Sequence, residues 1–505
     1  MTTNKLKILF FFILFAFVWL GSSCRKDFDY EDSTGNLSFS KDTIFLDTVF
    51  TNIGSSTYAL KVYNTSDKDL QIPSITLENG IESFYRINVD GQAGTSFLNT
   101  PLLAKDSLYI FIETTVDIST TNQTAFLYLD AIRFDTGIHE QKIPLVTLVK
   151  DAIFLFPSDI NQNALELGTT GNGEEIEVTG FELSDDQLNF NNEKAYVIYG
   201  YATVPKNKTL NIAAGARVYF HENSGIYLQE SSNIIIQGQK SSDAIALENE
   251  VIFEGDRLEP AYANTSGQWG TIWFDENSVA NELNYLTIKN ATIGLAVHGN
   301  TSTVTTNLTL KNTQIYNSSS VNLWTIGASI SAENVVMANA GGSSVNIKGG
   351  STISFIHSTI ANYWTSGNRL GPALQITNDT DQKTTATFGN CIITGNSTTE
   401  LSIASFNTNT DALEFQFTNS MITINAENFT GNPWYDFQNE TLYKNIMLNE
   451  EAAFVDPIKN IFALTATSFA LDKGDVVLAT QVPLDINEID RTTLPSLGAY
   501  QYTPE

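Results

Sequence analysis

The chain has 505 residues, and 27 lysines and arginines against 56 aspartates and glutamates give a formal net charge of −29. This surplus of negative charge repels polyanions, so the composition argues against a nucleic-acid partner. Only two cysteines are present, and the four histidines are too dispersed for clustered zinc ligands. We therefore expect no disulfide framework, no metal and no cofactor; a Ca²⁺ ion has no specific support.

The N-terminal segment has the pattern of a secretory signal. Two lysines precede an apolar run from Ile8 to Leu20, and small residues then lead to Cys24. The run is too short to span a bilayer and fits a signal-peptide core. The sequence predicts a signal peptide over 1–23 and lipidation of Cys24, although Gly21 stands where a lipobox usually has a large aliphatic residue. An ordinary secretory cleavage site is the alternative.

After a charged tether over 24–36, alternating apolar residues predict a β-sandwich over 37–150. Seven segments alternate between apolar and polar residues and are separated by turn residues. They are 43–50, 58–63, 70–72, 84–87, 107–113, 125–129 and 142–146. This number and spacing of strands is typical of an immunoglobulin-like sandwich. Residues 151–194 are rich in glycine and acids, and we interpret them as a connector with some β content.

One eight-residue template recurs six times between Leu286 and Ile422. Apolar residues occupy its first, third and eighth positions, and asparagine or histidine its fifth. The copies begin at 286, 308, 330, 353, 386 and 415, so the period is first regular and then stretched by insertions. Such a repeat indicates a solenoid in which each copy adds one strand. We expect the fifth positions to stack as a ladder: Asn290, Asn312, Asn334, His357, Asn390 and Asn419.

The segments between the copies distinguish a parallel β-helix from a leucine-rich repeat. A leucine-rich repeat needs a helical stretch in each turn, whereas these connectors contain Ser, Thr, Asn, Gly and further β-type pairs. We therefore predict an all-β chain with a right-handed parallel β-helix, a single-stranded solenoid, over 195–425. Weaker copies between 209 and 253 extend it to roughly ten turns.

The residues after the coil, 426–505, are predicted to form a C-terminal cap and closing segment. A solenoid needs a cap because its last turn otherwise exposes unpaired backbone. Asp485, Arg491 and the stretch Gly498–Tyr500 are similar to the closing motif of secreted bacterial β-helix proteins. We interpret this motif as structural, and Cys391, beside a ladder residue, as a buried wall residue.

The whole chain resembles the right-handed β-helix surface lipoproteins of the Bacteroidetes group. The likeness rests on the lipobox, the charged tract 25–32, the sandwich, the stretch 267–274 and the asparagine ladder. It implies a lipid anchor on Cys24 in the outer membrane, facing the cell exterior. The resemblance implies no activity, since β-helices host enzymes, adhesins and spacers alike.

Weak candidates for catalysis are two pairs of acids. Asp256 and Glu259 precede the stretch 267–274, and Asp379 and Asp381 lie in the insertion between the fourth and fifth copies. Hydrolases need acids that converge on one wall, and Ca²⁺-dependent lyases need acidic ligands. Neither pair matches a known hydrolase signature.

Two clusters of aromatic and arginine residues are better candidates for binding. Solenoid insertions project as loops, and aromatic rings with arginine suit sugar recognition. The predicted ligand contacts are Arg257, Trp269, Trp273, Tyr363, Trp364 and Arg369, with Tyr262 beside the first cluster. The alternative is that the tryptophans simply pack beneath loops.

Three functions therefore remain open. We expect a noncatalytic protein whose β-helix binds a glycan or another envelope protein. A polysaccharide lyase or glycoside hydrolase is the first alternative. A passive stalk or adhesin is the second.

Overall fold

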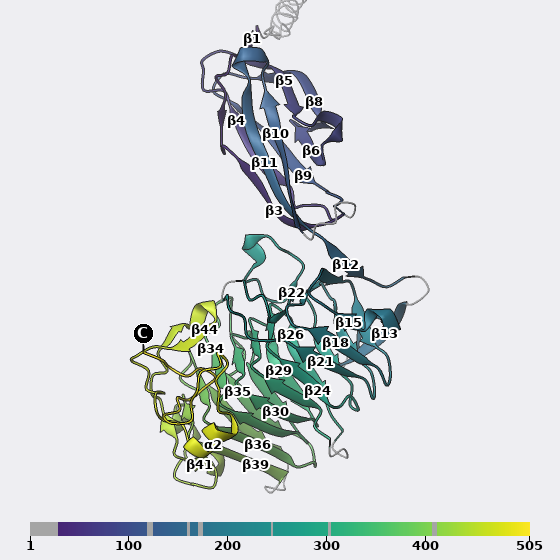
Figure 1. Ribbon diagram of the computed structural model, residues 1–505. Coiled ribbons are helices and arrows are strands. Elements are labelled where there is room, and N and C mark those ends of the chain that lie inside the picture. The colour runs from purple at the N-terminus through teal and green to yellow at the C-terminus, as the bar shows by residue number, and fades with distance from the viewer. Residues whose placement is uncertain are drawn as a thin grey trace, which may run out of the picture. The chain divides into compact units, whose positions relative to one another are not determined.

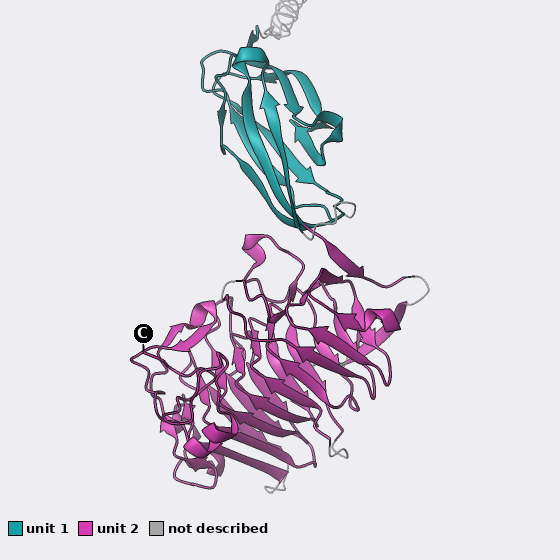
Figure 2. Ribbon diagram, viewed as in Figure 1, with its two compact units in different colours: residues 1–121, 125–149 teal, residues 122–124, 150–505 magenta. Residues whose placement is uncertain are grey.

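The computed structural model describes residues 29–118, 125–158, 162–169, 175–243, 246–300, 305–406 and 412–504. The predicted signal peptide and Cys24 lie outside these residues. The chain divides into two compact units, with the boundary at Val149–Lys150 (Figure 2). No helix in the described part is long and apolar enough to cross a membrane.

The first unit is a sandwich of two β-sheets around one core. Alternate residues along its strands are buried, as in β4 and β9, because strand side chains point alternately to either face. One sheet consists of β1 (Glu31–Asp32), β5 (Leu70–Leu77), β10 (Ala125–Phe134), β11 (Gln141–Lys150), β3 (Ile44–Phe50) and, beside β5, β8 (Ser96–Leu102). The other consists of β2 (Ser38–Phe39), β4 (Tyr58–Tyr63), β9 (Ser107–Thr114), β6 (Tyr85–Val89) and β7 (Gln92–Gly94). The assignment of the first unit to the immunoglobulin class stays a prediction.

The second unit is a coil with three long β-sheets, and it confirms the predicted all-β parallel solenoid (Figure 1). Sheet 1 runs β12 (Ala152–Leu155), β16 (Ala195–Ile198), β19 (Arg217–Phe220), β22 (Val251–Gly255), β25 (Leu286–Lys289), β28 (Gln314–Tyr316), β31 (Val336–Ala338), β34 (Thr359–Asn362), β37 (Ile392–Gly395), β40 (Met421–Ile422), β42 (Met447–Leu448). Sheet 2 runs β13 (Gln162–Thr169), β14 (Glu175–Glu182), β17 (Tyr201–Val204), β20 (Gly225–Leu228), β23 (Ile272–Phe274), β26 (Ile293–His298), β29 (Val321–Ile326), β32 (Val345–Lys348), β35 (Leu374–Asn378), β38 (Leu401–Ser405). Sheet 3 runs β15 (Asn189–Phe190), β18 (Thr209–Ala213), β21 (Asn233–Gln237), β24 (Asn281–Asn284), β27 (Leu308–Lys311), β30 (Ser329–Glu333), β33 (Thr352–Ile356), β36 (Thr384–Gly389), β39 (Leu413–Thr418), β41 (Tyr443–Lys444).

Parallel pairing extends beyond the predicted coil at both ends. The segment interpreted as a connector supplies β12, β14 and β15, which pair in parallel with β16, β17 and β18. At the other end β41 and β42 still pair with the preceding turn. The coil therefore spans 152–448, and among its described strands only the hairpin of β13 with β14 is antiparallel.

Five of the six template copies lie in exact register on sheet 3. Leu308, Ile330, Ile353, Ala386 and Phe415 are successive partners. The residue after each strand turns into sheet 1 with φ between 44° and 54°, a conformation that asparagine tolerates better than most residues. We call this corner, formed by Asn312, Asn334, His357, Asn390, Asn419 and Asn445, the covered corner.

Asn290 is not part of this column, so its place in the predicted ladder is wrong. It follows β25 of sheet 1, whereas the residue at the covered corner in that turn is Tyr285, with φ 46°. The turn contains the apolar alternation on both sheets, and the template matched the wrong strand. Asn290 instead pairs with Asn317, whose Nδ2 lies 2.5 Å from Asn290 Oδ1.

The coil is closed at its C-terminal end by aromatic side chains. Phe355, Phe388, Phe417 and Tyr443 stack along the interior, with ring centroids 4.7–5.6 Å apart. Phe437 then packs 4.5 Å from Tyr443, and the short helical turns η6 (Ala426–Phe429) and η7 (Pro433–Tyr435) add further rings. Residues 426–442 thus cover the end of the coil, as a solenoid cap must.

Residues 449–504, which we call the strap, run back along the outside of the coil. Its apolar residues, among them Phe454, Phe462 and Leu497, pack on Ala338, Ala361 and other side chains of sheet 1. Further along, α2 (Val476–Gln481) lies against the covered corner, because an added Cβ at Gly389 would meet Leu478 at 2.6 Å (Figure 1). The strap therefore buries a second apolar face of the coil.

The closing motif fixes the strap beside the covered corner, where the backbone N–H of Gly498 donates to the carbonyl of Asn390 at 2.8 Å. Arg491 is 1% exposed, and its guanidinium donates to the carbonyl oxygens of Gly498 and Ala499 at 3.0 and 3.1 Å. Asp485, also 1% exposed, accepts from the backbone of Ile489 and Gln501 at 2.7 and 2.8 Å. Burial lowers the pKa of Arg491 to about 10 and raises the pKa of Asp485.

Candidate functional site

Two long insertions lie on one corner of the coil. Residues 256–271 join β22 to β23, and residues 363–373 join β34 to β35, so both connect sheet 1 to sheet 2. We call this the open corner; its regular positions are Asn290, Asn317 and Asn339, with φ between 57° and 65°. Insertions far apart in sequence are brought together because successive turns stack at this edge.

The asparagines of the open corner hold the first insertion in place. Asn290 Nδ2 donates to the carbonyl of Ala263 at 3.0 Å, and Asn317 Nδ2 donates to the carbonyl of Asn264 at 2.9 Å. One turn further on, Asn339 Nδ2 donates to the carbonyl of Pro457 and to Asn460 Oδ1 of the strap, at 2.8 and 2.6 Å. The same amides that support the corner thus anchor the segments around it.

A pocket of about 520 Å³ lies between the two insertions and the strap, and we call it the loop pocket. Its lining residues are Asn264, Asn317, Asn339, Tyr363, Trp364, Thr365, Ser366, Ile458, Lys459, Asn460 and Ile461. The predicted contacts Tyr363 and Trp364 are therefore both in its wall. Asn264 and the strap residues were not predicted. The only sequence signals for them were the asparagine that follows each strand of sheet 1 and the presence of an insertion nearby.

The backbone of the second insertion is fixed by hydrogen bonds. The backbone N–H of Tyr363 donates to Asn339 Oδ1 at 2.8 Å, and that of Trp364 donates to Asn362 Oδ1 at 3.2 Å. Trp364 is 9% exposed, and Tyr363 is half-buried, with burial raising the pKa of its hydroxyl. The backbone that carries both rings is therefore fixed by these bonds.

Arg369 lies on the same insertion, but its contacts are with other protein groups that stabilise the insertion. Its guanidinium donates to the carbonyl of Asn362 at 2.6 Å and forms an ion pair with Glu400 at 3.0 Å. Glu400 is fully buried and also accepts from the backbone of Ser397 and Ala373, each at 2.8 Å. Burial raises the pKa of Glu400, and Arg369 opposes that shift. Arg369 thus ties the base of the insertion to the next turn and lies outside the lining of the loop pocket.

Arg257, Glu259 and Tyr262 form a compact group on the first insertion. The Arg257 guanidinium meets the Glu259 carboxylate at 2.8–3.1 Å and lies 3.9 Å from the centroid of the Tyr262 ring. The pKa of Arg257 is raised, chiefly by its hydrogen bond to Glu259. This group shares the open corner with the loop pocket but does not line it.

Trp269 is inside the coil and cannot be the ligand contact that the sequence suggested. It is 1% exposed, stacks on Phe220 at 4.2 Å, and donates from Nε1 to the carbonyl of Lys289 at 3.0 Å. The insertion starts after β22 and returns at Trp269, so this ring enters the core at the start of the next wall. The alternative, that the tryptophan packs beneath a loop, describes it better.

Trp273 lies on the outer face of sheet 2, away from the insertion residues with which it was grouped. It stacks on His298 at 4.4 Å, and Trp324 lies 6.2 Å away on a later strand. Leu165 and Leu167 join this apolar cluster. Burial lowers the pKa of His298 to about 4. Trp324 was missed, although it has the same strand position as Trp273 two turns later.

The four candidate acids do not converge. Asp256 and Glu259 follow β22 at the open corner, whereas Asp379 and Asp381 follow β35, where sheet 2 turns into sheet 3. Asp379 pairs with Lys348 at 3.5 Å. No group of three or more potential metal ligands occurs among the residues that the structure describes. These positions do not form the paired carboxylates of a hydrolase wall.

One pair at the open corner has a geometry that sequence reasoning did not foresee. Asp256, 12% exposed at its side chain, lies 2.8 Å through Oδ2 from Nδ1 of His221, which is 47% exposed. Tyr199 stacks on the His221 ring at 4.4 Å. A carboxylate at Nδ1 orients an imidazole and favours the tautomer with an unprotonated Nε2. Burial raises the pKa of Asp256, and His221 opposes that shift.

Comparison with known proteins adds little to this geometry. No family model matches the chain, and no curated protein matches it. Among solved structures, it is similar to a family 123 glycoside hydrolase from Clostridium perfringens, with 11% identity, a TM-score of 0.15, and coverage of 23% of this chain and 26% of the other. It is also similar to BcpA, the major pilin subunit of Bacillus cereus, with 16% identity, a TM-score of 0.16, and coverage of 30% and 54%. The chain thus spans well under two thirds of either protein, and neither likeness carries an argument.

Proposed function

We propose that this protein is a noncatalytic surface protein, anchored in the outer membrane by a lipid on Cys24, whose β-helix binds a glycan in the loop pocket. The observation that carries the proposal is the wall of that pocket, which combines two aromatic rings with amide and hydroxyl side chains. Ring faces pack against the apolar faces of sugars, and amides and hydroxyls bond their hydroxyl groups. Rigid positioning of Tyr363 and Trp364 lowers the entropic cost of binding.

A glycan array tests this proposal directly. Because Trp364 is mostly buried and its removal would disturb the insertion, the test variant is Thr365→Trp, which fills the pocket from an exposed position. Asn368→Trp is the matched control, since Asn368 is exposed on the same insertion and does not line the pocket. We expect at least a tenfold loss of glycan retention in Thr365→Trp and less than a twofold change in Asn368→Trp. No retained glycan, or equal binding by both variants, would contradict the proposal.

A polysaccharide-cleaving enzyme is the second candidate, and the His221–Asp256 pair favours it. An imidazole oriented by a carboxylate is a competent general base. If the protein cleaves polysaccharides, incubation with the retained glycans releases new reducing or unsaturated ends, and His221→Ala abolishes that release. If the unmodified protein releases no new ends, the enzymatic candidate is wrong and only the binding function remains.

A further inference from the structure

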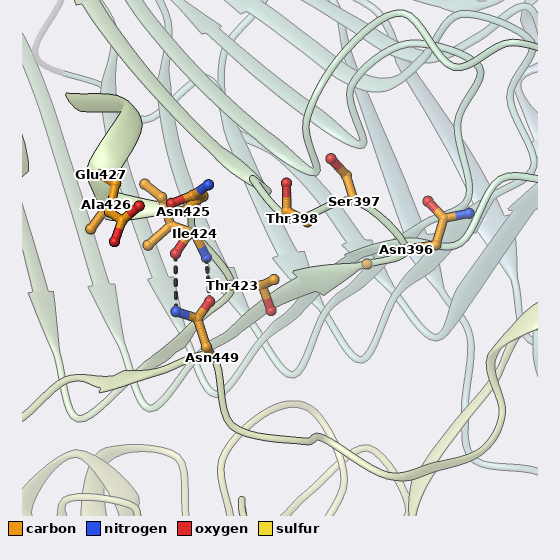
Figure 3. A pocket seen from close by; sticks show the side chains of 10 residues that line it. Asn396, Ser397, Thr398, Thr423, Ile424, Asn425, Ala426, Glu427 and Asn449 are labelled. Atoms are coloured by element: carbon orange, nitrogen blue, oxygen red, sulfur yellow. Dashed lines mark hydrogen bonds between the residues drawn. The ribbon is translucent and has the colours of Figure 1, made fainter.

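A second pocket, of about 630 Å³, lies further along the open corner (Figure 3). We call it the end pocket. Its lining residues are Gly395, Asn396, Ser397, Thr398, Thr423, Ile424, Asn425, Ala426, Glu427 and Asn449. They lie at or after the ends of β37, β40 and β42 of sheet 1, so they occupy the same edge of the coil as the loop pocket, in the next three turns.

The two pockets share the second insertion as a common boundary. Asn396, in the wall of the end pocket, donates from Nδ2 to the carbonyl of Trp364, in the wall of the loop pocket, at 3.1 Å. The Arg369–Glu400 ion pair and the bond from Ser397 to Glu400 fix this boundary from below.

The end pocket offers polar groups that its own structure leaves available. The floor is fixed, since Asn449 accepts from the backbone of Ile424 at 2.8 Å and donates back to its carbonyl at 3.0 Å (Figure 3). In contrast, the side chains of Thr398, Asn425 and Glu427 form no hydrogen bond or ion pair with any described residue. A hydroxyl, an amide and a carboxylate at one wall can all bond sugar hydroxyls.

The charges of the two pockets favour an uncharged ligand. Among their lining residues the charged side chains are Lys459, which pairs with Asp456 at 2.9 Å, and Glu427. The nearby Arg369 is neutralised by Glu400. A uronate or a sulfate would therefore lose its hydration without meeting a free cation, and the chain as a whole would repel it.

From these observations we infer that the end pocket and the loop pocket are two subsites for one unbranched, uncharged glycan chain lying along the open corner. The inference rests on the proposed function of the loop pocket. From the turn of Asn317 to that of Thr423 the corner spans four strand spacings, about 19 Å, which exceeds a single sugar ring. The first subsite supplies ring stacking, and the second supplies hydrogen bonds.

Titration calorimetry with oligosaccharides of two and six sugars tests the inference. The probes are cello-, xylo-, manno- and N-acetylchito-oligosaccharides, with hexagalacturonate as the charged comparison. The variants are Thr398→Ala combined with Asn425→Ala in the end pocket, Thr365→Trp in the loop pocket, and Thr309→Ala on sheet 3 as control. We expect one uncharged hexasaccharide to bind more tightly than its disaccharide. The double variant should then weaken the hexasaccharide about tenfold, by loss of two hydrogen bonds, and leave the disaccharide unchanged.

Each other outcome overturns a distinct statement. If Thr365→Trp abolishes hexasaccharide binding but the double variant matches Thr309→Ala, the end pocket is no subsite and the proposed function stands. If hexagalacturonate binds more tightly than every uncharged probe, the inferred ligand class is wrong. If no probe binds the unmodified protein, the inference falls together with the proposed function.

Discussion

Two corners of one coil place asparagine in the same left-handed conformation, and they differ in what lies beyond it. At the covered corner the amides of Asn334, Asn390 and Asn419 bond the strap, at the carbonyls of Leu484, Asp475 and Lys473. At the open corner Asn317 Nδ2 bonds the first insertion and Asn339 Oδ1 accepts from the backbone of Tyr363 in the second, with a pocket between these insertions. Asn339 Nδ2 also bonds the strap, at the carbonyl of Pro457. A regular column of asparagines therefore reflects the backbone conformation at a corner. The segments that pack on the corner, the strap or the insertions, determine whether it contributes to stability or to binding.

The largest expected effect sharpens this comparison with two arginines, one at each corner. Arg491→Ala removes the donors to two buried carbonyls and leaves the buried Asp485 without a nearby cation, so we expect a loss of about 3–5 kcal/mol in the free energy of unfolding. Arg257→Ala breaks a partly exposed pair and should cost about 1 kcal/mol or less. Urea unfolding followed by tryptophan fluorescence measures both, because every tryptophan after residue 24 lies in the coil unit. Equal losses would erase the distinction between the corners.

A smaller effect separates coverage from backbone conformation within the covered corner. Asn390 and Asn445 both have φ 54°, but Asn390 is fully buried and Asn445 is exposed. Replacement by alanine costs roughly 1–2 kcal/mol of left-handed strain at either position. Asn390→Ala also breaks bonds to His357 and Asp475, which adds about 1–3 kcal/mol. The same urea titration should therefore show a larger loss for Asn390→Ala, and similar losses would mean that the strap adds nothing at this position.

The smallest expected effect is a pH dependence at the one histidine of the column. Burial, with Arg491 nearby, lowers the pKa of His357 to about 2, so the folded protein holds it neutral while the unfolded chain takes up a proton below about pH 6.5. Stability that is present above pH 6.5 is therefore lost as the pH falls, by about 2 kcal/mol at pH 5. His357→Asn restores the residue used in the other turns and should remove this part of the pH dependence. The readout is the difference between the two proteins at pH 7.5 and pH 5, and parallel curves would show that His357 does not titrate on unfolding.

The sequence could predict the coil because its repeat follows the period of a strand. Leu308 to Phe415 lie in register as the template requires. The template assigned Asn290 to the wrong corner because apolar alternation occurs on more than one sheet of each turn. In that turn the residue at the covered corner is Tyr285, which does not match the asparagine or histidine of the template. The insertion near Ile360 was found because a solenoid must project extra length as a loop.

The rest of the site depends on contacts that sequence spacing cannot show. Residues of the strap contact residues of the coil that are far away in sequence, as Tyr500 and Gln314 do with a separation of 186 residues. Sequence spacing therefore could not assign the strap residues to the loop pocket. Arg369 and Trp269 were expected to contact a ligand because of their residue types. Their real partners, Glu400 and Phe220, lie on neighbouring turns, and burial there makes both side chains structural.

The strap also has a consequence for the order in which the chain can fold. Each turn of the coil pairs with a turn only a few dozen residues away, so pairing can spread from turn to turn along the chain. The outer apolar face of sheet 1 stays uncovered until the strap packs on it. From then on the strap links turns that otherwise touch only their neighbours, and a stack that could fray turn by turn becomes one cooperative unit.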